Sequence, residues 1–180
     1  MKYLAVPALL AVASLAVPAT AALPVGAKAP DFTTQAAVGG KPFTFSLKSA
    51  LKKGPVVLYF FPAAFTQGCT IEAHEFAVAS YEFEKQGATL IGLSADPIDK
   101  LAKFSVEACR NAFPVGTATP ATIKGYDVVL PQRTTLSNRT SYVIAPDGKV
   151  IYALSEMSPE GHVSGTMGAV KAWRAKHRKG

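Results

Sequence analysis

The fold is decided by the stretch Val56-Val57-Leu58-Tyr59-Phe60-Phe61-Pro62-Ala63-Ala64-Phe65-Thr66-Gln67-Gly68-Cys69. Its first six residues are continuously apolar, which is typical of a strand buried on both faces of a sheet. The next residues predict a turn, and the apolar spacing after them predicts a helix from Cys69 to about Lys85. A buried strand therefore delivers Cys69 through a turn to the start of a helix.

Further strands and helices alternate along the rest of the chain. Together with the stretch above, they predict an α/β fold with a central mixed β-sheet flanked by helices. Ligand sites in such folds lie at the carboxyl ends of the parallel strands, and Cys69 follows one such end. The additional segments are strands at Phe43–Ser46 and Thr89–Leu93, a helix at Ile98–Ala108, a hairpin of Ser141–Ile144 and Lys149–Leu154, and a last helix around Val163–Trp173.

The N-terminal residues predict a secretory signal peptide. Lys2 precedes an apolar run over residues 4–17, and Ala19-Thr20-Ala21 provides a small-x-small cleavage pattern. The run falls short of the ~20 residues that span a bilayer, so we expect no stable membrane insertion. We expect residues 1–22 to be the signal peptide and residues 23–180 to form one domain. The form of the signal indicates export, with the bacterial periplasm as the expected compartment.

Composition and charge exclude other classes of protein. Of the 180 residues, 49% are hydrophobic and 17% are charged, which excludes a disordered chain. The formal net charge is +7, and about +6 after removal of Lys2. The excess of basic residues lies at positions 171–179, where cations complement the dipole at the C-terminus of a helix. We therefore expect no nucleic-acid partner.

Cys69 has the sequence context of a reactive thiol. A free thiol has a pKa of about 8.5 and reacts as the thiolate, which a helix N-terminus favours. Thr66 lies three residues earlier, and its hydroxyl can accept from or donate to a small oxygen substrate. Arg139 offers forked donors for a thiolate and a developing oxyanion. Apart from Arg133, it is the only arginine placed at a strand start rather than in a helix or the tail. Glu72 lies on nearly the same helix face as Cys69 and could orient the arginine.

These residues resemble the peroxiredoxin family, and the nearest branch is the bacterioferritin comigratory, or Q-type, branch. The resemblance covers essentially the whole mature chain. It rests on four elements in order: Val25–Phe32 as the opening segment, Pro62, Thr66 and Cys69 in the motif Pro-x-x-x-Thr-x-x-Cys, Glu72 as the acidic residue that follows it, and Arg139 ahead of the strand at Tyr142-Val143-Ile144.

The resemblance implies a thioredoxin-like fold and a thiol-dependent peroxidase that reduces hydrogen peroxide and organic hydroperoxides. Cys69 would attack the peroxide and become a sulfenic acid. Pro62 would shield the sulfur, Thr66 would position the peroxide and Arg139 would stabilise the departing oxygen. No metal or organic cofactor is implied. The expected reductant is a thioredoxin-like protein or another thiol, and the expected assembly is a monomer or a homodimer.

The second cysteine leaves open how the sulfenic acid of Cys69 is resolved. Many members of this branch have a resolving cysteine five residues after the first, and His74 occupies that position here. Cys109, 109 − 69 = 40 residues downstream, is either the resolving cysteine or a buried thiol, and resolution by another molecule is the third possibility. A disulfide would require local unwinding around Cys69, because the Cα atoms must approach within about 7 Å.

Two other functions fit the same residues. The first is an exported disulfide oxidoreductase on the same fold, which the absence of Cys-x-x-Cys disfavours. The second is a non-catalytic binding protein in which Cys69 and Cys109 form a structural disulfide, as oxidising compartments allow.

Overall fold

The computed structural model describes residues 22–177, so the expected signal peptide lies outside the described residues except for Ala22. Its main sheet has seven strands, and two further strands form a small hairpin. The sheet contains β1 (Thr33–Val38), β2 (Lys41–Ser46), β3 (Val56–Phe60), β4 (Thr89–Ser94), β5 (Val115–Thr117), β8 (Thr140–Ile144) and β9 (Val150–Ser155), and the hairpin contains β6 (Val129–Leu130) and β7 (Arg133–Ser137).

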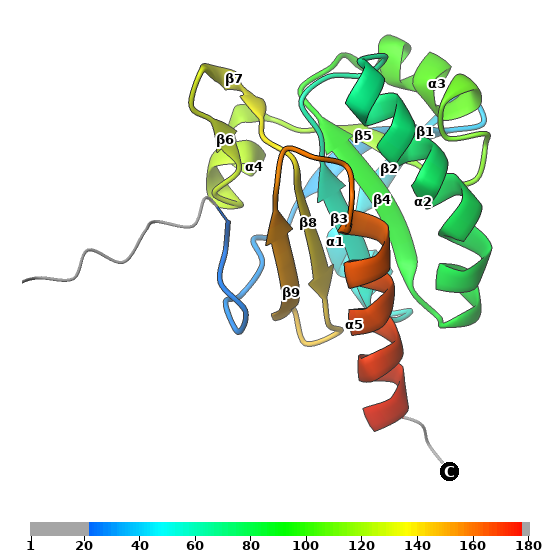
Figure 1. Cartoon of the computed structure of the whole chain (residues 1–180), viewed down its shortest axis with the longest axis vertical. Coiled ribbons are helices and arrows are strands. Elements are labelled where there is room, and N and C mark those ends of the chain that lie inside the picture. Colours follow the sequence, from blue (N-terminus) through cyan, green and yellow to red (C-terminus); the bar gives the residue numbers. More distant parts are fainter. Residues whose placement is uncertain (1–21, 178–180) are drawn as a thin grey trace, which may run out of the picture.

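The spatial order of the sheet is β2-β1-β5-β4-β3-β8-β9. β4 pairs in parallel with β3 and with β5, whereas the other pairings are antiparallel. The predicted mixed sheet is therefore confirmed. β3 lies between β4 and β8, so the strand that leads to Cys69 is in the interior of the sheet (Figure 1).

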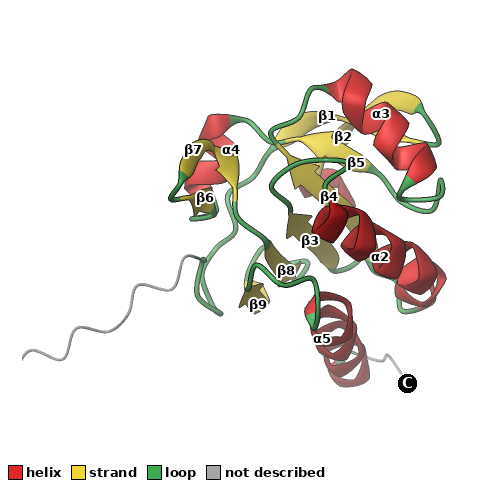
Figure 2. Cartoon of the chain, turned by 45° about the horizontal axis from the view of Figure 1, so that its top comes forward, coloured by secondary structure: helices red, strands yellow, loops and turns green. Residues whose placement is uncertain are grey.

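Helices cover both faces of this sheet. α2 and α5 lie side by side on one face together with α3, while the short helices α1 and α4 pack against the other face (Figures 1 and 2). None of the helices within residues 22–177 has the length and apolar character that crossing a membrane requires. The helices are α1 (Leu47–Leu51), α2 (Gln67–Lys85), α3 (Ile98–Glu107), α4 (Pro120–Gly125) and α5 (His162–Lys176).

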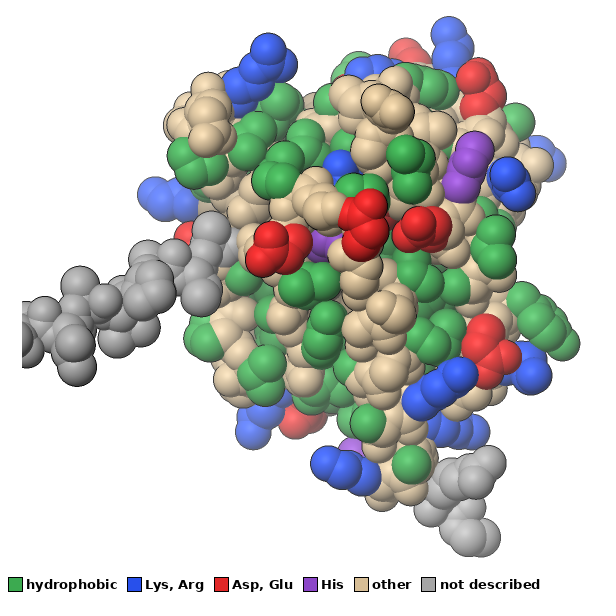
Figure 3. All heavy atoms as spheres, in the orientation of Figure 1, with side chains coloured by type: hydrophobic (Ala, Val, Ile, Leu, Met, Phe, Trp, Pro, Cys, Tyr) green, Lys and Arg blue, Asp and Glu red, His purple; other side chains and the backbone are tan. Residues whose placement is uncertain are grey.

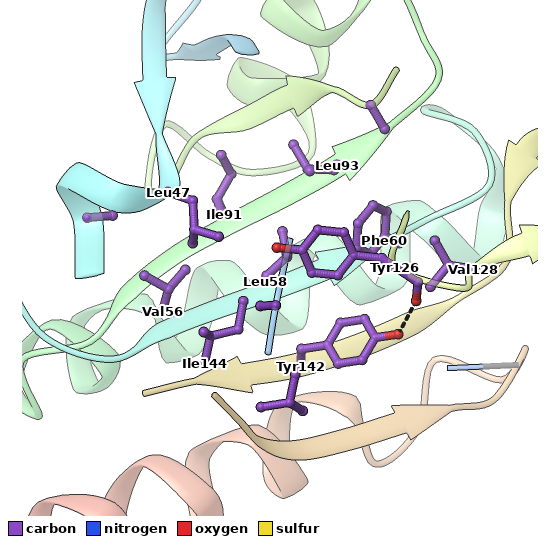
Figure 4. Packing of buried hydrophobic residues seen from close by; sticks show 14 of the residues in the cluster. Leu47, Val56, Leu58, Phe60, Ile91, Leu93, Tyr126, Val128, Tyr142 and Ile144 are labelled. Carbon is purple, nitrogen blue, oxygen red and sulfur yellow. Dashed lines mark hydrogen bonds between the residues drawn. The ribbon is translucent and has the colours of Figure 1, made fainter. Parts of the chain in front are cut away.

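Successive side chains of β3 point to opposite faces of the sheet, so the strand contributes to two separate hydrophobic clusters. Val56, Leu58 and Phe60 point to the face of α1 and α4, where they pack near Tyr126 and Tyr142 (Figure 4). The residues between them, among them Tyr59, point to the opposite face, under α2, α3 and α5. All five strand residues are fully buried, as the continuous apolar run predicts. Cys69 and Cys109 both belong to the second of these clusters.

Tyr59 is a buried tyrosine whose packing can be tested by substitution. Its ring stacks on Phe76 with 4.4 Å between centroids, and the backbone of Gly92 approaches so closely that a Cβ there would lie 2.6 Å from the ring. The Tyr59 hydroxyl is buried and has no hydrogen-bond partner among the described residues. Burial therefore holds the pKa of Tyr59 well above its ordinary value.

We expect Tyr59→Phe to raise the free energy of unfolding by about 1 kcal/mol, because it removes an unsatisfied polar group without changing the ring. Denaturant unfolding measures this change. Tyr142→Phe is the matched control: its hydroxyl donates to the carbonyl of Tyr126 at 2.7 Å and accepts from the amide of Leu23 at 3.1 Å. That substitution should lower the free energy of unfolding by about the same amount. Equal destabilisation by both substitutions would contradict the account.

Candidate active site

Cys69 is the third residue of α2, so the helix begins two residues earlier than the sequence predicted. The residue preceding the helix is Thr66, whose extended backbone (φ −75°, ψ 151°) makes it the N-cap. The sulfur therefore lies in the first turn, where unpaired amides and the helix dipole favour negative charge. Cys69 is a free thiol with only 2% of its surface exposed.

A hydrogen bond to the side chain of Asp96 stabilises the turn between β3 and α2. The Asp96 carboxylate accepts from the amide of Ala64 at 2.7 Å and from the hydroxyl of Ser94 at 2.8 Å. Phe65 adopts a left-handed backbone (φ 69°), which is costly for a residue with a side chain. Its ring packs in a T-shaped arrangement with the ring of Phe104, with 5.2 Å between the ring centroids. These contacts fix the shape of the turn, and nothing in the sequence pattern had indicated Asp96.

Pro62 and Thr66 lie at the two ends of this turn. Pro62 follows β3 and is partly exposed, whereas Thr66 is exposed beside the start of α2. The Thr66 hydroxyl donates to the carbonyl of Ala63 at 3.0 Å. Its proton is thus engaged, and the oxygen is left to accept a hydrogen bond. From the sequence, the Thr66 hydroxyl could either donate to a substrate or accept from it, and the structure leaves the accepting role.

Arg139 directly precedes β8, the strand that pairs with β3, and so comes close to Cys69. Its guanidinium is buried, with 4% exposed, and its Nη2 lies 3.5 Å from the Cys69 sulfur. Nη1 donates to the carboxylate of Glu72, and Nε donates to the carbonyl of Met157 at 2.9 Å. Gly68 makes room for this approach, because a Cβ there would lie 3.0 Å from Nη2.

The structure thus brings together three of the residues that the sequence singled out, namely Cys69, Glu72 and Arg139. Arg133, the other arginine considered, lies exposed at the start of β7. His74 lies in a groove between α2 and α5 with Glu75 and Glu160, on a face where acidic side chains gather (Figure 3).

Glu72 is fully buried one turn after Cys69. Burial raises its pKa to about 8, although the charge and the hydrogen bond of Arg139 act in the opposite direction. Only one carboxylate oxygen, Oε2, contacts the arginine. The other, Oε1, has no hydrogen-bond partner among the described residues and lies 3.7 Å from Nδ1 of His162.

His162 and Ser141 are residues that sequence reasoning missed. His162 is the first residue of α5, and it is fully buried and faces Glu72. Ser141 lies in β8, and its hydroxyl is 2.8 Å from Nδ1 of His162. The sequence shows only that His162, one of three histidines, stands at the start of an apolar helix. Such a position does not reveal a contact with another element of the fold.

Cys109 lies two residues after the end of α3 and is fully buried in the same cluster as Cys69. Burial raises the pKa of its thiol, so Cys109 stays protonated near neutral pH. The next two residues, Arg110 and Asn111, both have left-handed backbones (φ 51° and 60°). Both cysteines are free thiols in this structure.

Comparisons with known proteins identify related sequences. Residues 25–153 match the AhpC/TSA family. Peroxiredoxin Bcp of Xanthomonas campestris is 30% identical over 123 residues, which cover 65% of this chain and 76% of that protein. The chloroplastic peroxiredoxin Q of Oryza sativa subsp. japonica is 32% identical over 143 residues, which cover 79% of this chain and 64% of that protein.

Solved structures agree as well. The crystal structure of peroxidoxin BcpB from Mycobacterium tuberculosis is similar with a TM-score of 0.71 and 33% identity, covering 86% of this chain and 98% of the other. AhpC of the same organism has a TM-score of 0.75 at 17% identity, over 88% of this chain and 97% of the other, which supports the fold. The expected thioredoxin-like fold is thereby confirmed, and the chain belongs to the AhpC/TSA family as a peroxiredoxin, a thiol-dependent peroxidase.

Proposed function

We propose that Cys69 is the peroxidatic residue of this peroxidase. The observation that carries the proposal is the 3.5 Å contact between the Cys69 sulfur and a buried arginine in the first turn of a helix. The thiolate attacks one peroxide oxygen, so that an S–O bond forms and the O–O bond breaks. The sulfur is oxidised to the sulfenic acid, the peroxide is reduced, and the departing oxygen takes up a proton to leave as water or an alcohol.

The neighbouring residues divide the remaining tasks. Arg139 stabilises first the thiolate and then the negative charge on the departing oxygen, because its Nη2 already points at the sulfur. The oxygen of Thr66 accepts a hydrogen bond from the peroxide, since its own proton is held by Ala63. Pro62 limits the access of water to the sulfur, and Glu72 keeps the guanidinium in place.

We propose Cys109 as the resolving cysteine. Its thiol would attack the Cys69 sulfenic acid, which forms a disulfide and releases water. The two residues share one core cluster, and the left-handed residues Arg110 and Asn111 store backbone strain beside Cys109 that local unwinding would release. A thiol reductant, for which a thioredoxin-like protein is the expected class, would then restore both thiols.

We also propose that the protein is exported to the periplasm after cleavage near Ala21 or Ala22. The support is the sequence pattern of residues 1–22. In addition, the amide of Leu23 donates to the hydroxyl of Tyr142, which ties the chain to the fold just after the proposed cleavage point. The assembly we propose is a monomer or a homodimer.

The role of Cys69 predicts a complete loss of function on a minimal change. Cys69→Ser should abolish the rapid reduction of hydrogen peroxide with a thiol reductant, because a hydroxyl neither ionises nor takes up the oxygen under these conditions. Cys109→Ser, the matched control, should retain the first oxidation step. Rapid mixing with one equivalent of peroxide measures both. Peroxide loss at the wild-type rate in Cys69→Ser would refute the assignment.

The role of Cys109 is tested by intact mass after one equivalent of peroxide. The wild-type protein should lose two hydrogens, because an internal disulfide forms, whereas Cys109→Ser should gain one oxygen at Cys69. A gain of one oxygen in the wild-type protein, or a disulfide between two molecules, would assign resolution to another thiol.

Glu72 predicts a pH dependence of stability. Its pKa in the folded protein is raised, so between about pH 4.5 and about pH 8 the folded state holds a proton that the unfolded state releases. The contribution of Glu72 to stability is therefore lost as the pH rises through this range. Glu72→Gln cannot ionise, so its unfolding free energy relative to the wild type should increase from about pH 5 to about pH 9. A constant difference would contradict the raised pKa.

A further inference from the structure

A chain of buried polar groups continues beyond the arginine of the site. Glu72 binds Arg139 through Oε2 only, and its free Oε1 lies 3.7 Å from Nδ1 of His162. Both Glu72 and His162 are fully buried. A buried carboxylate oxygen without a donor costs free energy, so its orientation toward an imidazole requires an explanation.

The orientation of the His162 ring is fixed from two sides. Its Nε2 lies 3.0 Å from the carbonyl oxygen of Glu156, and a carbonyl only accepts, so Nε2 carries a proton. Nδ1 lies 2.8 Å from the hydroxyl of Ser141. In the neutral ring, therefore, Nδ1 is the acceptor, and it faces the serine hydroxyl and Glu72 Oε1 together.

A single proton on Glu72 or His162 makes this arrangement favourable. Without it, Glu72 Oε1 and His162 Nδ1 are two acceptors facing each other in a dry interior. Burial raises the pKa of Glu72 and lowers the pKa of His162, and both effects place the proton on the carboxyl group. The charged groups around the pair are Arg139 before β8, Glu75 on α2 and Glu156 after β9. The neutral phenol of Tyr59 approaches from β3.

We propose that His162, held by Ser141, is a positioning residue for the peroxidase reaction: it fixes the free oxygen of Glu72 and thereby controls how much of the Arg139 charge faces Cys69. The inference rests on the proposed roles of Cys69 and Arg139. When the proton is on Glu72, the charge of Arg139 is uncompensated and acts on the thiolate. When the proton is lost, the carboxylate neutralises the arginine, and the sulfur loses that stabilisation.

The reaction rate should consequently fall on the alkaline side as the Glu72–His162 pair loses its proton. Glu72→Gln imitates the protonated carboxyl and should remove this fall. His162→Phe removes Nδ1, so it should lower the rate constant for oxidation of Cys69 at neutral pH by on the order of tenfold. It should also shift the pH at which the rate constant falls on the alkaline side. His162→Asn places a polar atom near the position of Nδ1 and should recover most of the rate.

The experiment measures the rate constant of each variant with hydrogen peroxide across the pH range by rapid mixing. His162→Phe in the Glu72→Gln background should have no further effect, because His162 acts through Glu72. Thr166→Val is the control for a merely structural role. Thr166 is buried one turn further along α5, and its hydroxyl donates to the carbonyl of His162 at 2.7 Å without reaching Glu72. This variant should change thermal stability but not the pH profile.

Two outcomes would overturn the inference: a wild-type pH profile in His162→Phe, or the same loss of rate with and without Glu72→Gln. If His162→Phe does not fold, Ser141→Ala decides the matter, because it releases the ring while retaining both titrating groups. Ser141→Ala should move the alkaline fall, and an unchanged profile refutes the inference. Failure of the inference is distinct from failure of the proposed function, since the latter shows as peroxide reduction by Cys69→Ser.

Discussion

The buried guanidinium of Arg139 is the constraint on which the rest of the site depends. A charge removed from water is tolerated only when its partners are in place, and losing one partner of a buried pair costs about 3–5 kcal/mol. Arg139 meets this condition with the Cys69 sulfur, the Glu72 carboxyl group and the carbonyl of Met157. These partners come from α2 and from the segment after β9, so the arginine joins elements that are distant in the sequence.

Several local features are explained by that one placement. Gly68 leaves room for the guanidinium, because a Cβ there would lie 3.0 Å from Nη2. The turn after β3 must end in a fixed orientation, which Asp96 and the left-handed Phe65 provide. Glu72 sits one turn from Cys69, so the same helix presents both the thiol and the carboxyl that holds the arginine. The chemistry at the sulfur therefore depends on contacts between α2, the residue before β8 and the segment after β9.

The sequence predicted the parts of this arrangement that local rules determine. The apolar run of β3 and the spacing of α2 place Cys69 in the first turn of its helix, and helical geometry places Glu72 beside it. Arg139 was named by its position before a strand, and the structure selects it over Arg133. β2, β4, α3 and the β8–β9 hairpin also follow from the patterns, within two residues at each end.

Tertiary contacts were beyond those rules. The hydrogen bonds of Asp96 and the burial of His162 depend on elements that meet only in the folded chain. The strands β1 and β5 and the helix α4 went unpredicted because their residues carry weak patterns: β5 has three residues and α4 has six. The engaged proton of Thr66 likewise depends on the conformation of the turn rather than on residue spacing.

The measurement that tests the central claim most directly is the rate constant for oxidation of Cys69 by hydrogen peroxide in Arg139→Lys, with Arg133→Lys as the exposed control. A lysine retains the charge but cannot contact Cys69, Glu72 and the carbonyl of Met157 at once. The account predicts a fall of at least about a hundredfold in Arg139→Lys, as for the loss of one oxyanion donor, and no change in Arg133→Lys. A wild-type rate in a folded Arg139→Lys protein would contradict it.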